Sequence, residues 1–392
     1  MKVWHFSEMA YHPGWDQLGY SLRNSIPSRV ADPKIVADLL NRYLDEWALC
    51  DELGINIMVN EHHASATCLD SVCTVPLAIL ARETKKVRLL ALGMPIANRY
   101  DAVRVAEEYS MIDVISRGRV EMGFVKGSPL EIAPANSSPV DLMERFWEAH
   151  DLILKAMTTH DGPFNWEGKF FQYRQVNVWP RPYQTPHPPI WITCGSQGTA
   201  TVVAEKGYVI GVLNTGYTRT PGIFNAYRKR AAELGREAAH DRFAYMALIG
   251  VGETKEEGYR RAHQIADYSR TTPRANGWDF DPPGYNPLPL STKIMASAAA
   301  KGPGVSVFPV ERRDGSRVDV TKATVDEFIN AGLVFAGTPD MVYDQMKEFY
   351  DHVGGFGHLL MMGQGGHISH ADTVANLKLF SKEVLPRLSD LG

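Results

Sequence analysis

Apolar residues along the chain follow two alternating patterns. Short apolar runs are separated by longer stretches in which apolar residues recur every three or four positions. The short runs predict strands, and the longer stretches predict amphipathic helices. The predicted strands span residues 2–6, 55–61, 87–93, 119–125, 189–195, 208–213, 244–251 and 357–362. The predicted helices span residues 34–53, 71–84, 101–115, 139–158, 197–206, 221–235, 254–268 and 371–388.

Strands that alternate with helices favour a parallel sheet in an α/β protein. Right-handed crossovers then leave either a closed (β/α)8 TIM barrel or an open, doubly wound sheet, and the eight predicted strands favour the barrel. We therefore expect residues 1–392 to form a single barrel domain with insertions at the C-terminal face of the strands. A loop with strand-like pieces of its own follows residue 158.

A long segment, residues 270–320, departs from the alternation. It is rich in proline, glycine and aromatic residues. Connections of this length are often functional, so the segment is a candidate lid insertion within the barrel domain. The alternative is a solvent-exposed insertion without a catalytic role.

Composition excludes several classes of protein. The 392 residues are 44% hydrophobic and 22% charged, as in globular proteins, and the net charge of −4 comes without any basic run. We therefore expect no nucleic-acid partner. No apolar run is long enough for a membrane span, and no signal peptide is recognisable. The four cysteines lack the spacing of a metal site, so we expect a cytoplasmic protein with reduced thiols.

The stretch NIMVNEHHASA, residues 56–66, ends a predicted strand with Glu61, His62 and His63. A metal site, a catalytic site and structurally bonded histidines are the alternatives. Neighbouring residues on a strand point to opposite sides, so His62 and His63 are poorly placed to share a metal, and we predict none. One histidine should face the barrel mouth as an acid, a base or a hydrogen-bond donor.

Two further strand ends should lie at the same face of the barrel. One ends in Val125, Lys126, Gly127 and Ser128, and the other continues into TCGSQGTAT, residues 193–201, at the start of a helix. Backbone N–H groups at a helix start bind anions, and Lys126 on the neighbouring strand could reach the same phosphate. The spacing matches neither a P-loop nor a dinucleotide-binding fingerprint, and a simple helix cap explains the serine equally well.

In combination, these stretches resemble the bacterial luciferase-like flavin-dependent monooxygenases. The resemblance runs nearly end to end and is most specific between residues 87 and 127. There an apolar strand, a proline-containing turn and an acidic helix precede the pattern D-x-x-S-x-G-R. This pattern corresponds to Asp113, Ser116, Gly118 and Arg119. The segments NEHHASA, PIWITCGSQGTATVVAEKGY and FAGTPDMVYDQM complete the match.

The resemblance implies an enzyme that uses reduced FMN from a separate NAD(P)H:flavin reductase, with O2 as co-substrate. A C4a-hydroperoxyflavin would oxygenate a small apolar organic substrate. His62 matches the catalytic-site histidine of the family. The cofactor-binding positions fall on Leu90 and Ala91, where the family has a non-prolyl cis peptide bond, on Lys126, and on Gly195, Ser196 and Thr199.

Some positions depart from the family pattern, and two other functions stay open. Lys126 stands where the family usually has arginine, and Val125 replaces the reactive cysteine of luciferase, so light emission is not expected. A deazaflavin-dependent oxidoreductase and a non-catalytic flavin-binding protein are the alternatives.

The resemblance also implies a homodimer or larger homo-oligomer. We predict its interface on helices 71–84 and 101–115, through Val72, Ala78, Ala102, Val105 and Ala106.

Overall fold

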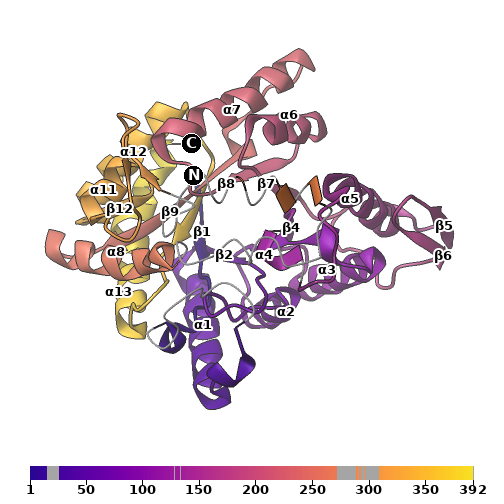
Figure 1. Ribbon diagram of the computed structural model, residues 1–392, viewed down its shortest axis with the longest axis horizontal. Helices are drawn as coiled ribbons and strands as arrows, with labels where there is room; N and C mark the ends of the chain where they lie inside the picture. Colours follow the sequence, from indigo (N-terminus) through magenta and orange to yellow (C-terminus); the bar gives the residue numbers. More distant parts are fainter. Residues whose placement is uncertain are drawn as a thin grey trace.

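Eight parallel strands close into a barrel in the computed structural model, as the alternating pattern predicts (Figure 1). The structure describes residues 1–15, 26–127, 129–132, 134–271, 288–289, 291–292, 296 and 309–391, so most of the candidate lid insertion, 270–320, lies outside the described residues. The pairing of β8 with β9 closes the ring, which excludes the doubly wound sheet. The barrel strands are β1 (Lys2–Phe6), β2 (Asn56–Val59), β3 (Leu89–Met94), β4 (Val120–Phe124), β7 (Ile190–Thr193), β8 (Val209–Val212), β9 (Phe243–Val251) and β13 (His358–Met362).

Helices surround the barrel, and each predicted helix has a counterpart (Figure 1). The last predicted helix, 371–388, is α-helical only to Leu379 and then continues as a π turn, η6 (Phe380–Val384), and a 3-10 turn, η7 (Leu385–Leu391). The Met1 ammonium group donates a hydrogen bond to the Leu388 carbonyl oxygen at 3.2 Å, so the two ends of the chain are adjacent. The matching helices are α1 (Pro33–Leu53), α2 (Thr74–Glu83), α3 (Ala102–Ser116), α5 (Leu142–Thr158), α6 (Gln197–Lys206), α7 (Gly216–Glu233), α8 (Lys255–Arg270) and α13 (His370–Leu379).

Helix α7 begins at Gly216, five residues before Pro221, where the sequence predicted its start. Proline is common in the first turn of a helix, which explains that prediction, but here Pro221 lies inside the helix. Its missing N–H leaves the Tyr217 carbonyl oxygen without its helical donor. The His352 side chain supplies that donor through Nε2, at 3.0 Å from the Tyr217 oxygen. A contact with the distant helix α12 (Pro339–Val353) therefore stabilises a helix start that local sequence disfavours.

Several short elements were not predicted as such. Strand β12 (Val334–Gly337) pairs in parallel with the C-terminal half of β9, outside the set of eight barrel strands. The loop after residue 158 contains an antiparallel hairpin, β5 (Phe164–Glu167) and β6 (Gln172–Val176), which projects beyond α5 in Figure 1. A short pair, β10 (Val310–Glu311) and β11 (Arg317–Val318), and the helix α11 (Val325–Asn330) precede β12. Their lengths of two to six residues explain why no periodic pattern marks them.

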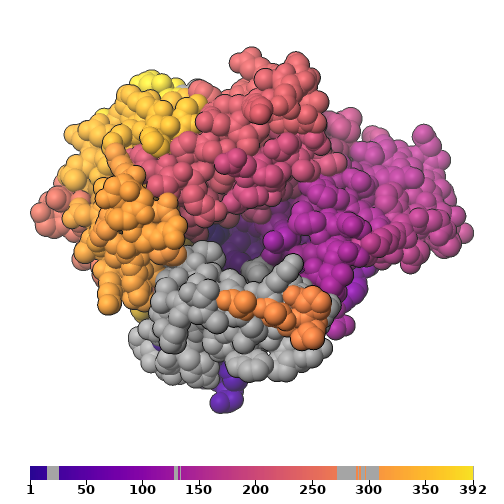
Figure 2. Space-filling model, turned by 45° about the horizontal axis from the view of Figure 1, so that its top comes forward, coloured from indigo at the N-terminus to yellow at the C-terminus, as the bar shows by residue number. Residues whose placement is uncertain are grey.

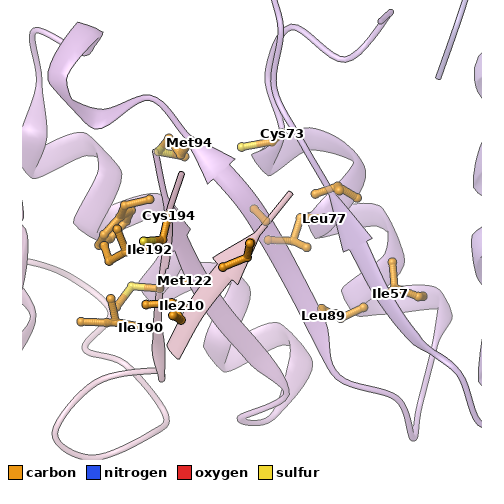
Figure 3. Close-up of a cluster of buried hydrophobic side chains, with 14 of the residues drawn as sticks. Ile57, Cys73, Leu77, Leu89, Met94, Met122, Ile190, Ile192, Cys194 and Ile210 are labelled. Atoms are coloured by element: carbon orange, nitrogen blue, oxygen red, sulfur yellow. The ribbon is translucent and has the colours of Figure 1, made fainter. Parts of the chain in front are cut away.

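The core follows the two-sided alternation of the strands. On β3, Leu89 and Ala91 pack outward against the helices, whereas Leu90 and Leu92 point into the barrel. Figure 3 shows the outward set, in which Ile57 and Leu89 face Leu77 of α2. Inside the barrel, Trp4 and Trp191 meet edge to face with ring centroids 5.2 Å apart. Large apolar side chains therefore fill both sides of the wall, as in a packed barrel rather than a pore.

The D-x-x-S-x-G-R pattern forms a junction between α3 and β4. Arg117 and Gly118 have positive φ angles of 58° and 83°, which turn the chain back toward the strand. The Arg119 guanidinium donates to the carbonyl oxygens of Ala81, Thr84, Val87 and Ser116 and to the Thr84 hydroxyl. A single cation thus joins the end of α2, the start of β3 and the end of α3. The pattern is explained by barrel assembly rather than by catalysis.

The predicted dimer surface is wrong in part. Ala102, Val105 and Ala106 are buried within the chain, because they form the side of α3 that packs on the barrel. Val72 is 39% exposed and remains on the surface. Across the described residues, no helix combines the length and the apolar character that crossing a membrane requires.

Candidate active site

The side chains at the end of β2 alternate beyond the last strand residue. Met58 points into the barrel, and Asn60 and His62 follow on the same side. Glu61 and His63 bond to each other on the opposite side, with Nε2 and Oε1 at 3.2 Å. The two rings therefore have different neighbours: His62 contacts Glu131 and Glu8, whereas His63 contacts Glu61, and the catalytic role of His62 stays a prediction.

Two buried carboxylates flank the His62 ring. Its Nδ1 lies 2.5 Å from Oε1 of Glu131, which belongs to the short helix α4 (Pro129–Ile132). Its Nε2 lies 3.6 Å from Oε2 of Glu8, which follows β1. Both carboxylates are 5% exposed. An ionised carboxylate only accepts hydrogen bonds, so a carboxylate at the Glu131 position favours the tautomer of His62 that carries its proton on Nδ1.

A network behind His62 holds the flanking groups in position. Asn60 donates from Nδ2 to Oε2 of Glu8 at 2.7 Å, and the Cys68 thiol contacts the Asn60 amide oxygen at 3.8 Å. The His62 backbone N–H donates to the Asp70 carbonyl oxygen at 3.0 Å. Burial raises the pKa of the Asp70 carboxyl to about 8, so at neutral pH this group is mostly uncharged. Glu8 and Glu131 are therefore the carboxylates that face the His62 ring.

Glu61 supports the site from the outer side of the barrel. Its carboxylate accepts from Arg99 Nη2 at 2.6 Å and from the Cys73 backbone N–H at 3.1 Å, besides the His63 contact. Burial alone would raise the pKa of Glu61, but the bonds from His63, Arg99 and Cys73 lower it below the ordinary value. Glu61 thus fixes the β2–α2 connection, which carries His62, while His63 has a structural contact.

The predicted anion site lies on adjacent strand ends. Phe124 of β4 pairs with Ile192 of β7, so two residues later Lys126 and Cys194 leave the sheet at the same level. Ser196 caps α6 by accepting from the Thr199 backbone N–H at 3.3 Å. Lys126 is exposed and its ammonium is in no ion pair that joins the described residues. The register therefore brings the predicted cation next to the predicted helix start. Ser128 lies outside the described residues.

A guanidinium that sequence reasoning missed also reaches this site. Arg219, on the first turn of α7, donates from Nη2 to the Gly195 carbonyl oxygen at 2.9 Å. The chain between β8 and α7 carries no phosphate-binding pattern, so only the packing of α7 beside α6 reveals this neighbour.

The cis peptide bond lies two residues beyond its predicted place. It joins Leu92 to Gly93, not Leu90 to Ala91. Strand β3 continues to Met94, so Leu90 and Ala91 are mid-strand residues, both fully buried. The Ala91 side chain faces the helices, whereas Leu92 points inward at the C-terminal end. A contact of Leu90 or Ala91 with a cofactor stays a prediction, and Leu92–Gly93 is better placed for one.

Glu8 and Glu131 were also missed by sequence reasoning. Glu8 continues the inward alternation of Trp4 and Phe6 on β1, and that periodicity could have identified it. Glu131 offers no such signal, because it lies 69 positions from His62 and follows a loop at the end of β4. Among the described residues, no three His, Cys, Asp or Glu side chains form a set that would hold a metal ion.

The strand ends have room and polar groups for a phosphorylated flavin. A Cβ atom added at Gly195 or Gly198 would meet nothing within 4 Å, so the start of α6 opens to free space. Near the end of β4, the buried Asn98 amide has neither its nitrogen nor its oxygen hydrogen-bonded within the described structure. An added Cβ on Gly127 would come within 2.6 Å of this amide, which places Asn98 beside Lys126. The residues present therefore fit a ligand with a phosphate and further acceptors.

The chain belongs to the luciferase-like monooxygenase family, whose model matches residues 20–355. Two curated relatives align over about half to two thirds of their own length. The first, an uncharacterized protein of Sinorhizobium fredii, is 28% identical, and the alignment covers 57% of this chain and 66% of the relative. The second, the oxygenase component of a flavin-dependent trigonelline monooxygenase from Acinetobacter baylyi, is 26% identical, and the alignment covers 46% of this chain and 50% of the relative.

Other relatives span the whole barrel. An F420-dependent glucose-6-phosphate dehydrogenase of Amycolatopsis mediterranei is 24% identical over 90% of this chain and 96% of its own. The oxygenating constituent of 3,6-diketocamphane monooxygenase from Pseudomonas putida, a type II Baeyer–Villiger monooxygenase solved with FMN, superposes with a TM-score of 0.70. It is 18% identical and covers 99% and 98% of the two chains, which confirms the fold.

Glu61→Gln should lower the free energy of unfolding by about 3 kcal/mol at neutral pH, because removing one partner of a buried ion pair leaves the other uncompensated. The pKa of the Glu61 carboxyl is lower in the folded chain than in the unfolded chain. Its stabilisation is therefore complete above the ordinary glutamate pKa of about 4.3 and disappears as the pH falls through the lowered value. Urea denaturation of both proteins across this pH range measures the difference.

The exposed pair of Glu107 and Arg104, 3.0 Å apart, supplies the control. Glu107→Gln should cost only about 0–1 kcal/mol. Equal losses for the two substitutions, or a Glu61→Gln loss that persists at acid pH, would contradict the assigned role of Glu61.

Proposed function

We propose that the chain is the oxygenase component of a two-component flavin-dependent monooxygenase. It would take reduced FMN from a separate NAD(P)H:flavin reductase and use O2 to oxygenate a small apolar organic substrate. The observation that carries the proposal is the juxtaposition, at one end of the barrel, of a phosphate-type site on β4 and β7 with a carboxylate-flanked histidine on β2. The trigonelline relative, itself an oxygenase component, and the FMN complex of the diketocamphane enzyme support it.

The strand ends would hold the flavin by its phosphate. Lys126 and the start of α6, from Gly195 to Thr199, would surround the anion, with Arg219 beside them; the Thr199 N–H already caps the helix through Ser196, so the N–H groups before it would bind the phosphate. Reduced FMN supplies the two electrons with which one oxygen atom enters the substrate and the other leaves as water. The protein supplies position and shielding from water.

His62 would hold and deliver the proton that this chemistry needs. Glu131 orients the ring through Nδ1, and Glu8 stabilises the charge from the Nε2 side. An imidazole N–H beside two carboxylates is a hydrogen-bond donor and can give a proton to a nearby oxygen atom. A protein that only bound flavin would have no need for a histidine between two buried carboxylates, so this arrangement favours a catalytic role.

A deazaflavin-dependent oxidoreductase is the second candidate. The F420-dependent relative matches this chain over 90% of its length, and a protonated histidine between carboxylates also suits hydride-transfer chemistry that uses no oxygen. Direct titration of the purified protein with reduced FMN and with F420, both without oxygen, separates the two candidates. Preferential binding of F420 would overturn the proposed function.

Lys126→Ala should weaken binding of reduced FMN by about tenfold or more, because a charge-assisted hydrogen bond contributes about 1.5–3 kcal/mol. Riboflavin, which lacks the phosphate, should bind both proteins equally. Anaerobic fluorescence titration measures both affinities, and Lys378→Ala, an exposed lysine on α13, is the control. An unchanged ratio of FMN to riboflavin affinity in Lys126→Ala would remove Lys126 from the site.

His62→Ala should leave the affinity for reduced FMN within a few-fold while lowering product formation by about 10²–10⁴-fold, the usual contribution of an acid–base group. Hydrogen peroxide released per NAD(P)H consumed should rise, and Glu131→Gln should show the same defect in milder form. His63→Ala, a neighbouring imidazole bonded to Glu61, is the matched control and should change mainly stability. The opposite ranking of the two histidine variants would show that the wrong ring has been assigned.

We further propose a homodimer through the outer faces of α2 and α3. These helices expose apolar side chains in i, i+3 and i+4 relation, namely Val75 at 57%, Ile79 at 36%, Met111 at 51%, Val114 at 40% and Ile115 at 44%. These exposed residues take the place of Ala102, Val105 and Ala106, which are buried, in the proposed interface.

Val75→Glu should convert a dimer to a monomer at micromolar protein, because it buries a charge in an apolar interface. Sedimentation velocity measures the species. Val202→Glu, a valine of α6 that is 38% exposed, should leave the assembly unchanged. A wild-type protein that sediments as a monomer would contradict the proposal.

A further inference from the structure

A cavity of about 310 Å³ lies beside His62, away from the phosphate-type site. Lining residues between Ile26 and Ala31, without Arg29, form one wall, and lining residues between Ala64 and Ser71, without Thr67 and Asp70, form the other. Tyr11 and His62 lie between the two walls. All of these lining residues belong to the first 71 residues of the chain, so the cavity is distinct from the wider hollow that the space-filling view shows between the red and purple segments (Figure 2). The cavity thus lies next to the proposed catalytic ring of His62 and outside the proposed site of the flavin phosphate.

The described walls are apolar or carry neutral polar groups. Ile26, Val30 and Leu69 supply apolar surface, and the hydroxyl groups come from serines and Tyr11. No lysine, arginine, aspartate or glutamate is among the described lining residues. The Tyr11 hydroxyl accepts a hydrogen bond from the Asp32 backbone N–H at 3.0 Å, so this polar group is already bonded within the wall.

The charge of His62 does not make the cavity an anion site. An imidazolium would be the single cation of the described wall, and it already faces Glu131 and Glu8 at 2.5 and 3.6 Å. An incoming anion would lose its hydration and meet two carboxylates behind that ring. A neutral molecule would instead gain from burying apolar surface against the alanine and leucine side chains.

Size limits the guest as well. Small-molecule pockets range over about 300–1,000 Å³, and this cavity lies at the lower end of that range. A compact skeleton fits within this volume. One carbonyl or hydroxyl group on the guest would find donors in His62 and in the serine hydroxyls of the wall.

We propose that this cavity is the substrate pocket and that it selects a neutral, compact, mostly apolar molecule with a single carbonyl or hydroxyl group, such as a cyclic ketone. It would reject carboxylates and sugar phosphates of similar size. The term substrate rests on the proposed function, but binding in the cavity does not, because it requires neither flavin nor oxygen.

Binding to the flavin-free protein tests the inference with probes of matched skeleton. Ligand-observed NMR titration would compare norbornan-2-one, norbornane-2-carboxylate and glucose 6-phosphate. The ketone should bind at least tenfold more tightly than either anion. An anion that binds as tightly as the ketone, or a ketone that does not bind at millimolar concentration, would overturn the proposal.

Two substitutions locate the binding. Ala31→Leu fills the cavity from one wall and should weaken ketone binding at least tenfold, and Ala66→Leu, from the opposite wall, should do the same if Ala31→Leu fails to fold. Ala226→Leu is the control, since Ala226 is half-buried against the same core as Ala31 but lies on α7. Unchanged affinity in a folded cavity variant places the ketone elsewhere. Loss of FMN binding with ketone binding intact would instead refute only the proposed function.

Discussion

The two-sided geometry of a strand determines where the chemistry of this chain is placed. In a closed barrel each strand has one side toward the interior and one toward the helices, and β2 keeps this alternation for four residues past its end. Asn60 and His62 therefore enter the mouth, whereas Glu61 and His63 anchor the connection from outside. A shift of one residue would exchange these roles, so the apolar pattern of β2 also sets the register of the site.

Two buried carboxylates orient the His62 ring at the end of β2. Glu131 and Glu8 come from different loops, and both are withdrawn from solvent, a cost that their contacts with the ring and the Asn60 bond to Glu8 help to offset. The adjacent strand ends bring Lys126 and Arg219 close to the start of α6. The proposed proton donor and the proposed anion site would thus lie at the C-terminal face, where parallel barrels place their catalytic groups.

Local sequence predicted the features that depend on periodicity. The barrel strands and the eight predicted helices follow from apolar spacing over a few residues, but the 15-residue helix α12 was not predicted. The opposed histidines follow from strand alternation, and Lys126 follows from its place at a strand end. Features that depend on distant contacts were not accessible. The start of α7 depends on His352, more than a hundred residues away, and Glu131 reaches His62 from another loop. The cis bond was placed two residues early because its position was carried over from the family resemblance, whereas the end of β3 was predicted within one residue.

The most direct measurement is a crystal structure of the chain with FMN bound and reduced in the absence of oxygen. The account predicts phosphate density between Lys126 and the segment from Gly195 to Thr199, with the isoalloxazine ring against Leu92–Gly93 and in contact with His62. Phosphate density elsewhere, or a ring that lies away from His62 while His63 contacts it, would contradict the account.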